Sequence, residues 1–127
     1  MAAEIYQISF ERFDAMIGDF PEKPVVLSAA KLASDILVGM YNDEPLVYIG
    51  LVPPHIFSDV AYVWMMTTPA GDAHPILLAR YGAKTLETIL LKYHTLHGHC
   101  FSEKSARWLK RLGAEFTSET KFEIRRG

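Results

Sequence analysis

Two periodicities of hydrophobic residues alternate along this chain and divide it into strands and helices. Alternating or continuous apolar runs rich in β-branched and aromatic residues predict strands, over residues 4–10, 35–41, 45–52, 60–68, 96–101, 115–118 and 122–125. Apolar residues at spacings of three and four predict helices, over residues 10–17, 25–34, 75–94 and 102–112. The order β-α-α-β-β-β-α-β-α-β-β indicates one mixed α/β (α+β) domain that covers residues 1–127.

Short polar or glycine-containing segments mark where these elements begin and end. Ser9 is a predicted N-cap of the first helix, and Gly18 follows its last residue. Asn42-Asp43-Glu44 separates two β-rich runs, which predicts a hairpin. Gly82 lies inside the long helix, where glycine costs about 1 kcal/mol relative to alanine but permits close packing. The run 60–68 is almost wholly apolar and therefore predicts a central strand covered on both faces.

The segment 101–116 has the clearest secondary-structure signals in the chain. Ser102 is a predicted N-cap, and Gly113 occupies the position where a left-handed residue ends a helix. Leu109 and Leu112, with Ala106 or Trp108 before them, form one apolar stripe. The other side is basic, with Lys104, Arg107, Lys110 and Arg111. A solvated charged face explains these residues well, and contact with a phosphate or an acidic partner is the alternative.

Composition and charge narrow the range of partners and compartments. The formal net charge of −2 gives no global field that favours nucleic acid or an anionic membrane, so neither is an expected partner. The single cysteine, Cys100, excludes an intrachain disulfide and fits a reducing compartment. The first residues lack the basic start of a signal peptide, and no apolar run approaches the roughly 20 residues of a membrane helix. We expect a cytoplasmic protein, or one packed into a particle assembled there.

The phrase KSARWLKRLGAEF resembles the closing signature of GNAT-type N-acetyltransferases, whose pattern reads roughly N-x-x-A-x-x-L-Y-x-x-L-G-F. It is particularly similar to the small GNAT-like proteins of tailed bacteriophages. The match covers residues 102–116 well and residues 35–116 by the order of elements. The resemblance implies a mixed central sheet, splayed between its fourth and fifth strands (60–68 and 96–101) and flanked by about four helices.

The resemblance also implies a site for acyl coenzyme A (CoA). Family members hold its pyrophosphate on backbone N–H groups of [RQ]-x-x-G-x-[GA], directly after the fourth strand. The residues that this carries over as cofactor-binding are Met66, Thr67, Thr68, Gly71, Ala73, Ser102 and Arg107. The corresponding loop here has one glycine, a carboxylate at Asp72 and a proline at Pro69, which lacks an N–H. An acidic residue in a phosphate cradle argues against tight binding.

The sequence lacks one of the groups that would catalyse acyl transfer in the family. Many family members protonate the departing thiolate with a tyrosine, and Leu109 stands at that position. Tyr62 and His99, with Asp59, are candidates for deprotonating an amine because they lie near the fourth strand. The simpler interpretation makes Tyr62 a core or edge aromatic and Asp59 a turn residue.

A metal site is a further alternative, because His94, His97, His99 and Cys100 follow one another closely and imidazole and thiolate suit zinc. Only His97 and His99 are expected on one face of a strand, so no metal site is predicted. Cys100 is expected to be a buried, inert thiol.

Two functions are compatible with these residues. The departures from the family pattern favour a GNAT-fold protein without strong catalysis, acting as a binding or virion-assembly component of a phage. The alternative is an N-acetyltransferase that moves an acetyl group from acetyl-CoA to an amine, so enzymatic activity stays open. A homodimer and phage virion proteins are the expected partners, in the host cytoplasm or a virion.

Overall fold

The computed structural model describes residues 3–55, 57–100 and 103–125. Its elements are β1 (Ala3–Ile8), α1 (Phe10–Ile17), α2 (Lys23–Lys31), β2 (Asp35–Tyr41), β3 (Glu44–Val52), β4 (Val60–Thr67), α3 (Pro69–Asp72), α4 (Pro75–Lys92), β5 (Thr95–His99), α5 (Glu103–Arg111), β6 (Glu115–Phe116) and β7 (Lys121–Arg125). This is the predicted order with one addition. The additional element is α3, so the described residues contain five helices instead of about four.

Helix α3 forms where the sequence suggested only a break. Thr68 caps it by accepting from the amide of Gly71, and Pro69 occupies the first turn, where its fixed φ suits a helix. A similar correction applies to α2. It begins at Lys23 instead of residue 25 because Pro24 also lies in a first turn.

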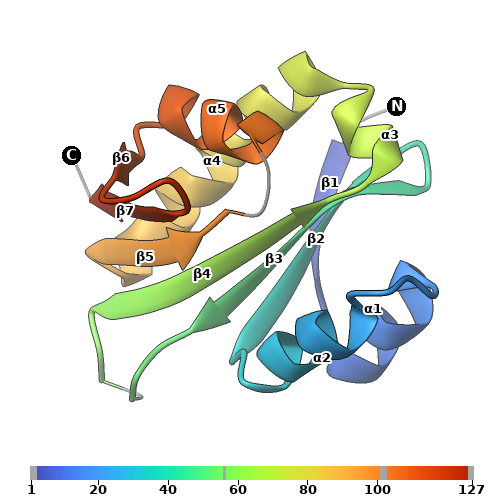
Figure 1. Cartoon of the computed structure of the whole chain (residues 1–127), viewed down its shortest axis with the longest axis horizontal. Helices are drawn as coiled ribbons and strands as arrows, with labels where there is room; N and C mark the ends of the chain where they lie inside the picture. The colour runs from blue at the N-terminus through green and yellow to red at the C-terminus, as the bar shows by residue number, and fades with distance from the viewer. Residues whose placement is uncertain (1–2, 56, 101–102, 126–127) are drawn as a thin grey trace.

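One seven-stranded sheet, in the order β1-β2-β3-β4-β5-β7-β6, runs through the molecule (Figure 1). All neighbours are antiparallel except β4 and β5, which are parallel. The predicted hairpin joins β2 and β3 through Asn42 and Asp43, whose φ values of 50° and 65° make the left-handed two-residue turn typical of hairpins. Glu44 already belongs to β3.

The two parallel strands part at the carboxyl end of β4. They are paired from Val60 opposite Thr95 to Trp64 opposite His99. The last three residues of β4 continue alone with β3, up to Thr67 opposite Val47. The amide of Cys100 instead bonds to the Thr120 carbonyl at 2.8 Å, so the chain leaves β4 after His99. This confirms the predicted splay between the fourth and fifth strands.

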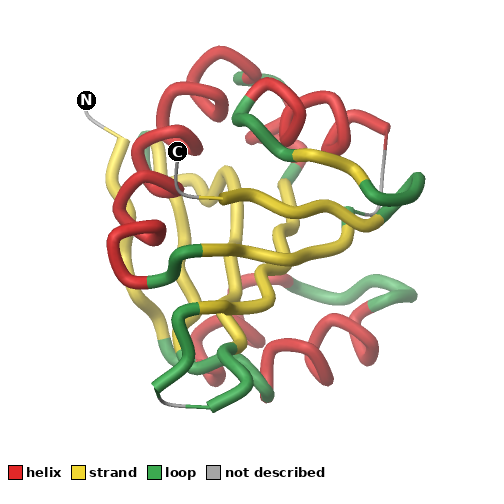
Figure 2. The backbone as a smooth tube through the Cα atoms, turned by 90° about the vertical axis from the view of Figure 1, so that its left-hand side faces the viewer, coloured by secondary structure: helices red, strands yellow, loops and turns green. Residues whose placement is uncertain are grey.

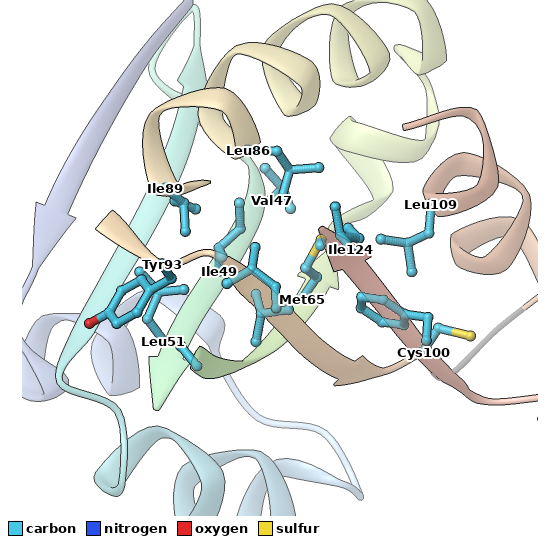
Figure 3. Packing of buried hydrophobic residues seen from close by; sticks show 14 of the residues in the cluster. Val47, Ile49, Leu51, Met65, Leu86, Ile89, Tyr93, Cys100, Leu109 and Ile124 are labelled. Carbon is cyan, nitrogen blue, oxygen red and sulfur yellow. The ribbon is translucent and has the colours of Figure 1, made fainter. Parts of the chain in front are cut away.

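Helices α4 and α5 lie on one side of the sheet, and α1 and α2 lie on the other (Figures 1 and 2). The larger core cluster lies under α4 and α5. Figure 3 shows Leu86 and Ile89 of α4 pointing toward Val47 and Ile49 of β3 within it. A smaller cluster lies under α1 and α2, built around Phe13, Ala30, Ile36, Val38 and Tyr48. The two clusters make the sheet the central layer of the domain.

The expectation that β4 is covered on both faces is wrong for its first half. Tyr62 is 54% exposed. Trp64 and Met66, further along the same face, pack against the cluster under α1 and α2. These helices therefore cover β2, β3 and the second half of β4, and the first half of β4, at Tyr62, stays open on this face.

Helix α5 ends and packs as predicted from the sequence. Gly113 has a φ of +99°. Leu109 is buried, and Ala106, Trp108 and Leu112 pack against the larger cluster. A Cβ on Gly82 would lie 2.5 Å from Trp108 Cζ2, so this glycine does permit close packing of α4 and α5. The predicted cap Ser102 lies outside the described residues. Among the described helices, none is long and apolar enough to cross a membrane.

Candidate functional site

A cavity of about 250 Å³, which we call the α5 cleft, lies where β4 separates from β5. Four elements contribute to it: the end of β4, α3, the first turn of α4, and α5. Its lining residues are Thr67, Asp72, Pro75, Leu78, Arg107, Trp108 and Arg111. The structure therefore brings together Thr67 and Arg107, which were predicted to bind the cofactor from segments 40 residues apart in the sequence.

The α5 cleft carries more positive than negative charge. Arg107 and Arg111 are four residues apart and therefore share one side of α5. Neither arginine forms an ion pair within the described residues, and the same holds for Asp72. Two guanidinium groups and one carboxylate therefore line the cavity. The arrangement suits an anion with several acceptor oxygens, such as a phosphate ester.

Two further features belong to the residues and helices that border the cleft, a buried indole N–H and the start of α4. Trp108 Nε1 is buried and, among the described residues, has no hydrogen-bond acceptor. Helix α4 begins at Pro75 without a side-chain cap from His74, and helix geometry leaves the amides of Ile76 and Leu77 without intrahelical acceptors. The positive end of the dipole of this 18-residue helix is therefore at the cleft.

The predicted phosphate loop itself uses its amides internally. Gly71 N donates to Thr68 Oγ1 at 3.0 Å, and Ala73 N donates to the Pro69 carbonyl at 3.1 Å. A Cβ on Gly71 would overlap the Leu46 carbonyl oxygen, so this glycine allows α3 to rest on β3. The role of Gly71 and Ala73 as phosphate ligands stays a prediction. The structure gives Gly71 a packing role.

A second hollow of about 490 Å³ lies between the end of α1, β3, the end of β4 and the start of α3, and we call it the α1 pocket. Its lining residues are Met16, Ile17, Phe20, Pro45, Tyr48, Met66, Thr67, Thr68 and Pro69. Of the predicted cofactor residues, Met66 and Thr68 lie here instead of in the cleft. Thr68 Oγ1 is bonded to the Pro45 carbonyl at 2.6 Å, and Thr67 lines both hollows.

Tyr62 and His99, the predicted catalytic residues, are brought together, but not in the cleft. They line a separate hollow of about 190 Å³ with His97, Lys121 and Glu123. Tyr62 lies five residues before Thr67 along β4, a separation of about 16 Å. His99 lies opposite Trp64, which is three residues, or about 10 Å, before Thr67. Their catalytic role stays a prediction.

The sequence did not single out Glu123 as the neighbour of His97. His97 Nδ1 lies 3.8 Å from Glu123 Oε2, and the Tyr62 and His97 ring centroids are 5.9 Å apart. The three residues form one row across β4, β5 and β7. Such a row depends on strand order and register, which no local pattern gave.

Leu109, at the position where the resemblance expects a tyrosine acid, is 1% exposed and belongs to the core. Cys100 is buried, with its Sγ 4.0 Å from the Glu119 carbonyl oxygen. No group of three potential metal ligands occurs within residues 3–55, 57–100 and 103–125. Ser102 lies outside these residues. Trp108 and Arg111 line the cleft but were not among the predicted cofactor residues. The sequence analysis named Arg111 only as part of the basic side of the helix, for which contact with a phosphate was the alternative.

Comparison with known proteins gives a match in fold and none in sequence. No protein-family model matches the chain, and no curated protein matches it. Among solved structures, the aminoglycoside acetyltransferase AAC(6′)-Ib in complex with coenzyme A matches with a TM-score of 0.67 at 11% identity, over 98% of this chain and 95% of that chain. The GNAT domain of S. lividans PAT matches with a TM-score of 0.71 at 9% identity, over 98% and 90%.

A GNAT family acetyltransferase from Brucella melitensis in complex with acetyl-CoA matches with a TM-score of 0.65 at 14% identity, over 99% of this chain and 89% of that chain. These likenesses span almost the whole of both chains. The protein therefore has a GNAT-like fold, a single α+β domain, as its closing phrase and element order predicted.

Proposed function

We propose that the α5 cleft binds the phosphates of an acyl-CoA and that the protein transfers the acyl group to an amine. The observation that carries this proposal is a pair of guanidinium groups, Arg107 and Arg111, that have no ion-pair partner among the described residues and line a cavity at the point where β4 and β5 part. GNAT-fold structures with coenzyme A or acetyl-CoA bound support the choice of ligand.

The residues present fit the groups of CoA. Arg107 and Arg111 line the cleft and can supply charge-assisted hydrogen bonds to phosphate. The last residues of β4 pair with β3 on one edge only, so backbone groups on their other edge have no strand partner. That edge suits the amides of the pantetheine arm, as predicted for Met66 to Thr68.

Bound acyl-CoA supplies an activated thioester carbonyl. The amine nitrogen forms a bond to this carbon, the C–S bond breaks, the nitrogen loses a proton and the thiolate gains one. Leu109 cannot donate that proton, because it is a buried aliphatic side chain. Proton transfer would therefore involve solvent or another group at the end of β4.

A second candidate function is a CoA-binding or assembly component without catalysis. Leu109 favours it, as does the distance of Tyr62 and His99 from the cleft. In this proposal the protein acts in a phage virion or the host cytoplasm, with virion proteins or a second copy as partners. The similarity of the closing phrase to tailed-phage proteins supports this assignment.

Isothermal titration with CoA tests the proposal. We expect Arg107→Ala and Arg111→Ala each to weaken binding by about tenfold, because a hydrogen bond to a charged group contributes about 1.5–3 kcal/mol. Raising the salt concentration should weaken wild-type binding. The matched control is Lys84→Ala, which removes an exposed cation of α4 outside the cleft. No binding at millimolar CoA, or an equal loss in Lys84→Ala, would contradict the proposal.

Thiol release separates the two functions. Incubation of acetyl-CoA with the protein and a panel of primary amines should release free CoA if the protein is an enzyme. CoA binding without any release above the uncatalysed rate would favour the component without catalysis.

A further inference from the structure

We propose that the α1 pocket binds an uncharged, largely apolar ligand that carries one hydrogen-bonding group, and that the Tyr48 hydroxyl recognises this group. The pocket lies on the other side of Thr67 from the α5 cleft, and its occupation does not require CoA. If the proposed function holds, the ligand is the acyl chain or the uncharged, apolar part of the amine acceptor. The chemistry of the pocket is the same in either case.

The lining of the α1 pocket is almost entirely apolar. Aliphatic and thioether side chains come from α1 and β4, and Phe20 adds an aromatic ring. Apart from the phenol of Tyr48, no lining side chain is ionisable. Thr68 already has partners, since its hydroxyl bonds to the Pro45 carbonyl and caps α3. An apolar ligand of modest size therefore gains contacts here without displacing a charged group.

Tyr48 is the exception within this lining. Its side chain is 1% exposed, and its hydroxyl has no hydrogen-bond partner among the described residues. The ring is fixed edge-on against Phe13, with the centroids 5.1 Å apart. Burial raises the pKa of Tyr48, so the hydroxyl stays protonated and available as a donor at neutral pH. A buried hydroxyl without a partner is costly, and a ligand that pairs with it removes that cost.

The lining of the pocket includes two flexible side chains. Met16 and Met66 line the pocket, and both pack against the cluster that contains Tyr48. Methionine side chains are unbranched and adapt their shape at low cost. Because the hydroxyl is buried, a ligand group reaches it only after a side-chain shift in the lining, which these two residues can make at low cost.

The residues in and near the pocket disfavour recognition of a cation. Asp14 and Asp19, the acidic residues at the end of α1 and just after it, both pair with Lys23, at 3.0 and 3.3 Å. An ammonium group in the pocket would lose its hydration and meet no free carboxylate on the lining. The preferred ligand is therefore uncharged.

Binding of p-cresol, measured by titration of amide chemical shifts in the CoA-free protein, tests the proposal. We expect p-cresol to bind about fivefold more tightly than toluene, which has the same ring without the hydroxyl, because one neutral hydrogen bond distinguishes them. Benzylammonium should bind more weakly than p-cresol. Tyr48→Phe should abolish the preference for p-cresol and leave the toluene affinity unchanged.

Two variants complete the test. Tyr41→Phe removes a partly buried hydroxyl outside the pocket and should leave the preference intact. Ile17→Phe fills the pocket and should weaken p-cresol and toluene equally. The proposal is wrong if p-cresol does not saturate at millimolar concentration, if benzylammonium binds as well, or if Tyr48→Phe keeps the preference.

Butyryl-CoA distinguishes the two sources of the ligand. If it displaces p-cresol while CoA does not, the pocket holds the acyl chain. If p-cresol and butyryl-CoA bind together, the pocket holds the acceptor. Failure of butyryl-CoA to bind at all would overturn the proposed function and leave the p-cresol result standing.

Discussion

The α5 cleft and the α1 pocket lie on either side of the end of β4, and they differ in charge. Among the described residues, two arginines without ion-pair partners and one aspartate line the cleft, whereas Tyr48 is the only ionisable residue that lines the pocket. Thr67 lines both, and the short helix α3 contributes Asp72 to one and Pro69 to the other. The end of one strand thus separates a surface suited to anions from a surface suited to apolar groups.

This difference has a structural origin. The cleft exists because β5 leaves β4 after His99, which brings α5 and its arginines to the end of the sheet. The pocket exists because α1 ends at Ile17, beside β3 and the end of β4. Charge in the cleft comes from side chains of α5, since the loop that was expected to bind phosphate uses the amides of Gly71 and Ala73 internally.

The largest effect is expected from Gly71→Ala, which disturbs the wall between the two hollows. The new methyl group would overlap the Leu46 carbonyl, which is backbone and cannot rotate away. We expect a loss of about 3 kcal/mol in the free energy of unfolding, measured by urea denaturation, and weaker binding in both hollows. Gly39→Ala is the control, because its methyl would lie 3.1 Å from a Val47 side-chain atom and 4.0 Å from the Val47 carbonyl oxygen, which is ordinary contact. Equal stability of the two variants would contradict the packing role of Gly71.

Gly82→Ala is expected to affect the cleft and spare the pocket. Its methyl would lie 2.5 Å from Trp108 Cζ2, so α5 must shift away from α4. The clash is partly offset by the better helix propensity of alanine, which leaves a net loss of about 1 to 2 kcal/mol. CoA affinity should fall while p-cresol affinity is kept. A parallel loss of both would show that the two sites are not independent.

Tyr48→Phe should change the pH dependence of stability. Burial raises the folded-state pKa of Tyr48 above its ordinary value of 10.0. As the pH rises, the unfolded chain therefore loses the Tyr48 proton before the folded protein does. The contribution of the protonated Tyr48 to the free energy of unfolding is complete below pH 10.0 and is lost as the pH rises through the folded-state pKa. The variant should lose less stability than wild type above this pH, and at neutral pH it should gain up to about 1 kcal/mol. Urea denaturation between about pH 8 and about pH 11, a range that brackets the ordinary tyrosine pKa, measures this loss of stability. A decline in the variant identical to that of wild type would contradict the prediction.

The smallest effect is expected from Asp72→Asn. It removes the one carboxylate that lines the cleft, which should tighten CoA binding by about threefold, because exposed like-charge repulsion is worth less than about 1 kcal/mol. Binding of p-cresol should not change. Asp59→Asn makes the same charge change outside the cleft and should leave CoA affinity unaltered. Weaker CoA binding in Asp72→Asn would mean that this carboxylate assists the ligand.

Local sequence patterns predicted the elements well. The spacing of apolar residues gave every described strand and the four longer helices, and the closing phrase gave the position of the splay. Ser9 caps α1 by accepting from Arg12 N, and Gly113 ends α5 with a positive φ, as expected from local backbone chemistry. Helix α3 was missed because one turn is too short to show a periodicity.

By itself, the sequence determined the order of elements, the single domain and the basic side of α5, because each depends on residues that are near one another in the chain. Only the tertiary structure decided which residues share a cavity. In the tertiary structure, Arg107 and Thr67 line the same cleft, whereas Tyr62 and His99 line a separate hollow. The Tyr48 hydroxyl is buried beside a pocket. These relations depend on strand order, register and helix packing, which bring together residues far apart in sequence and leave no trace in a local pattern.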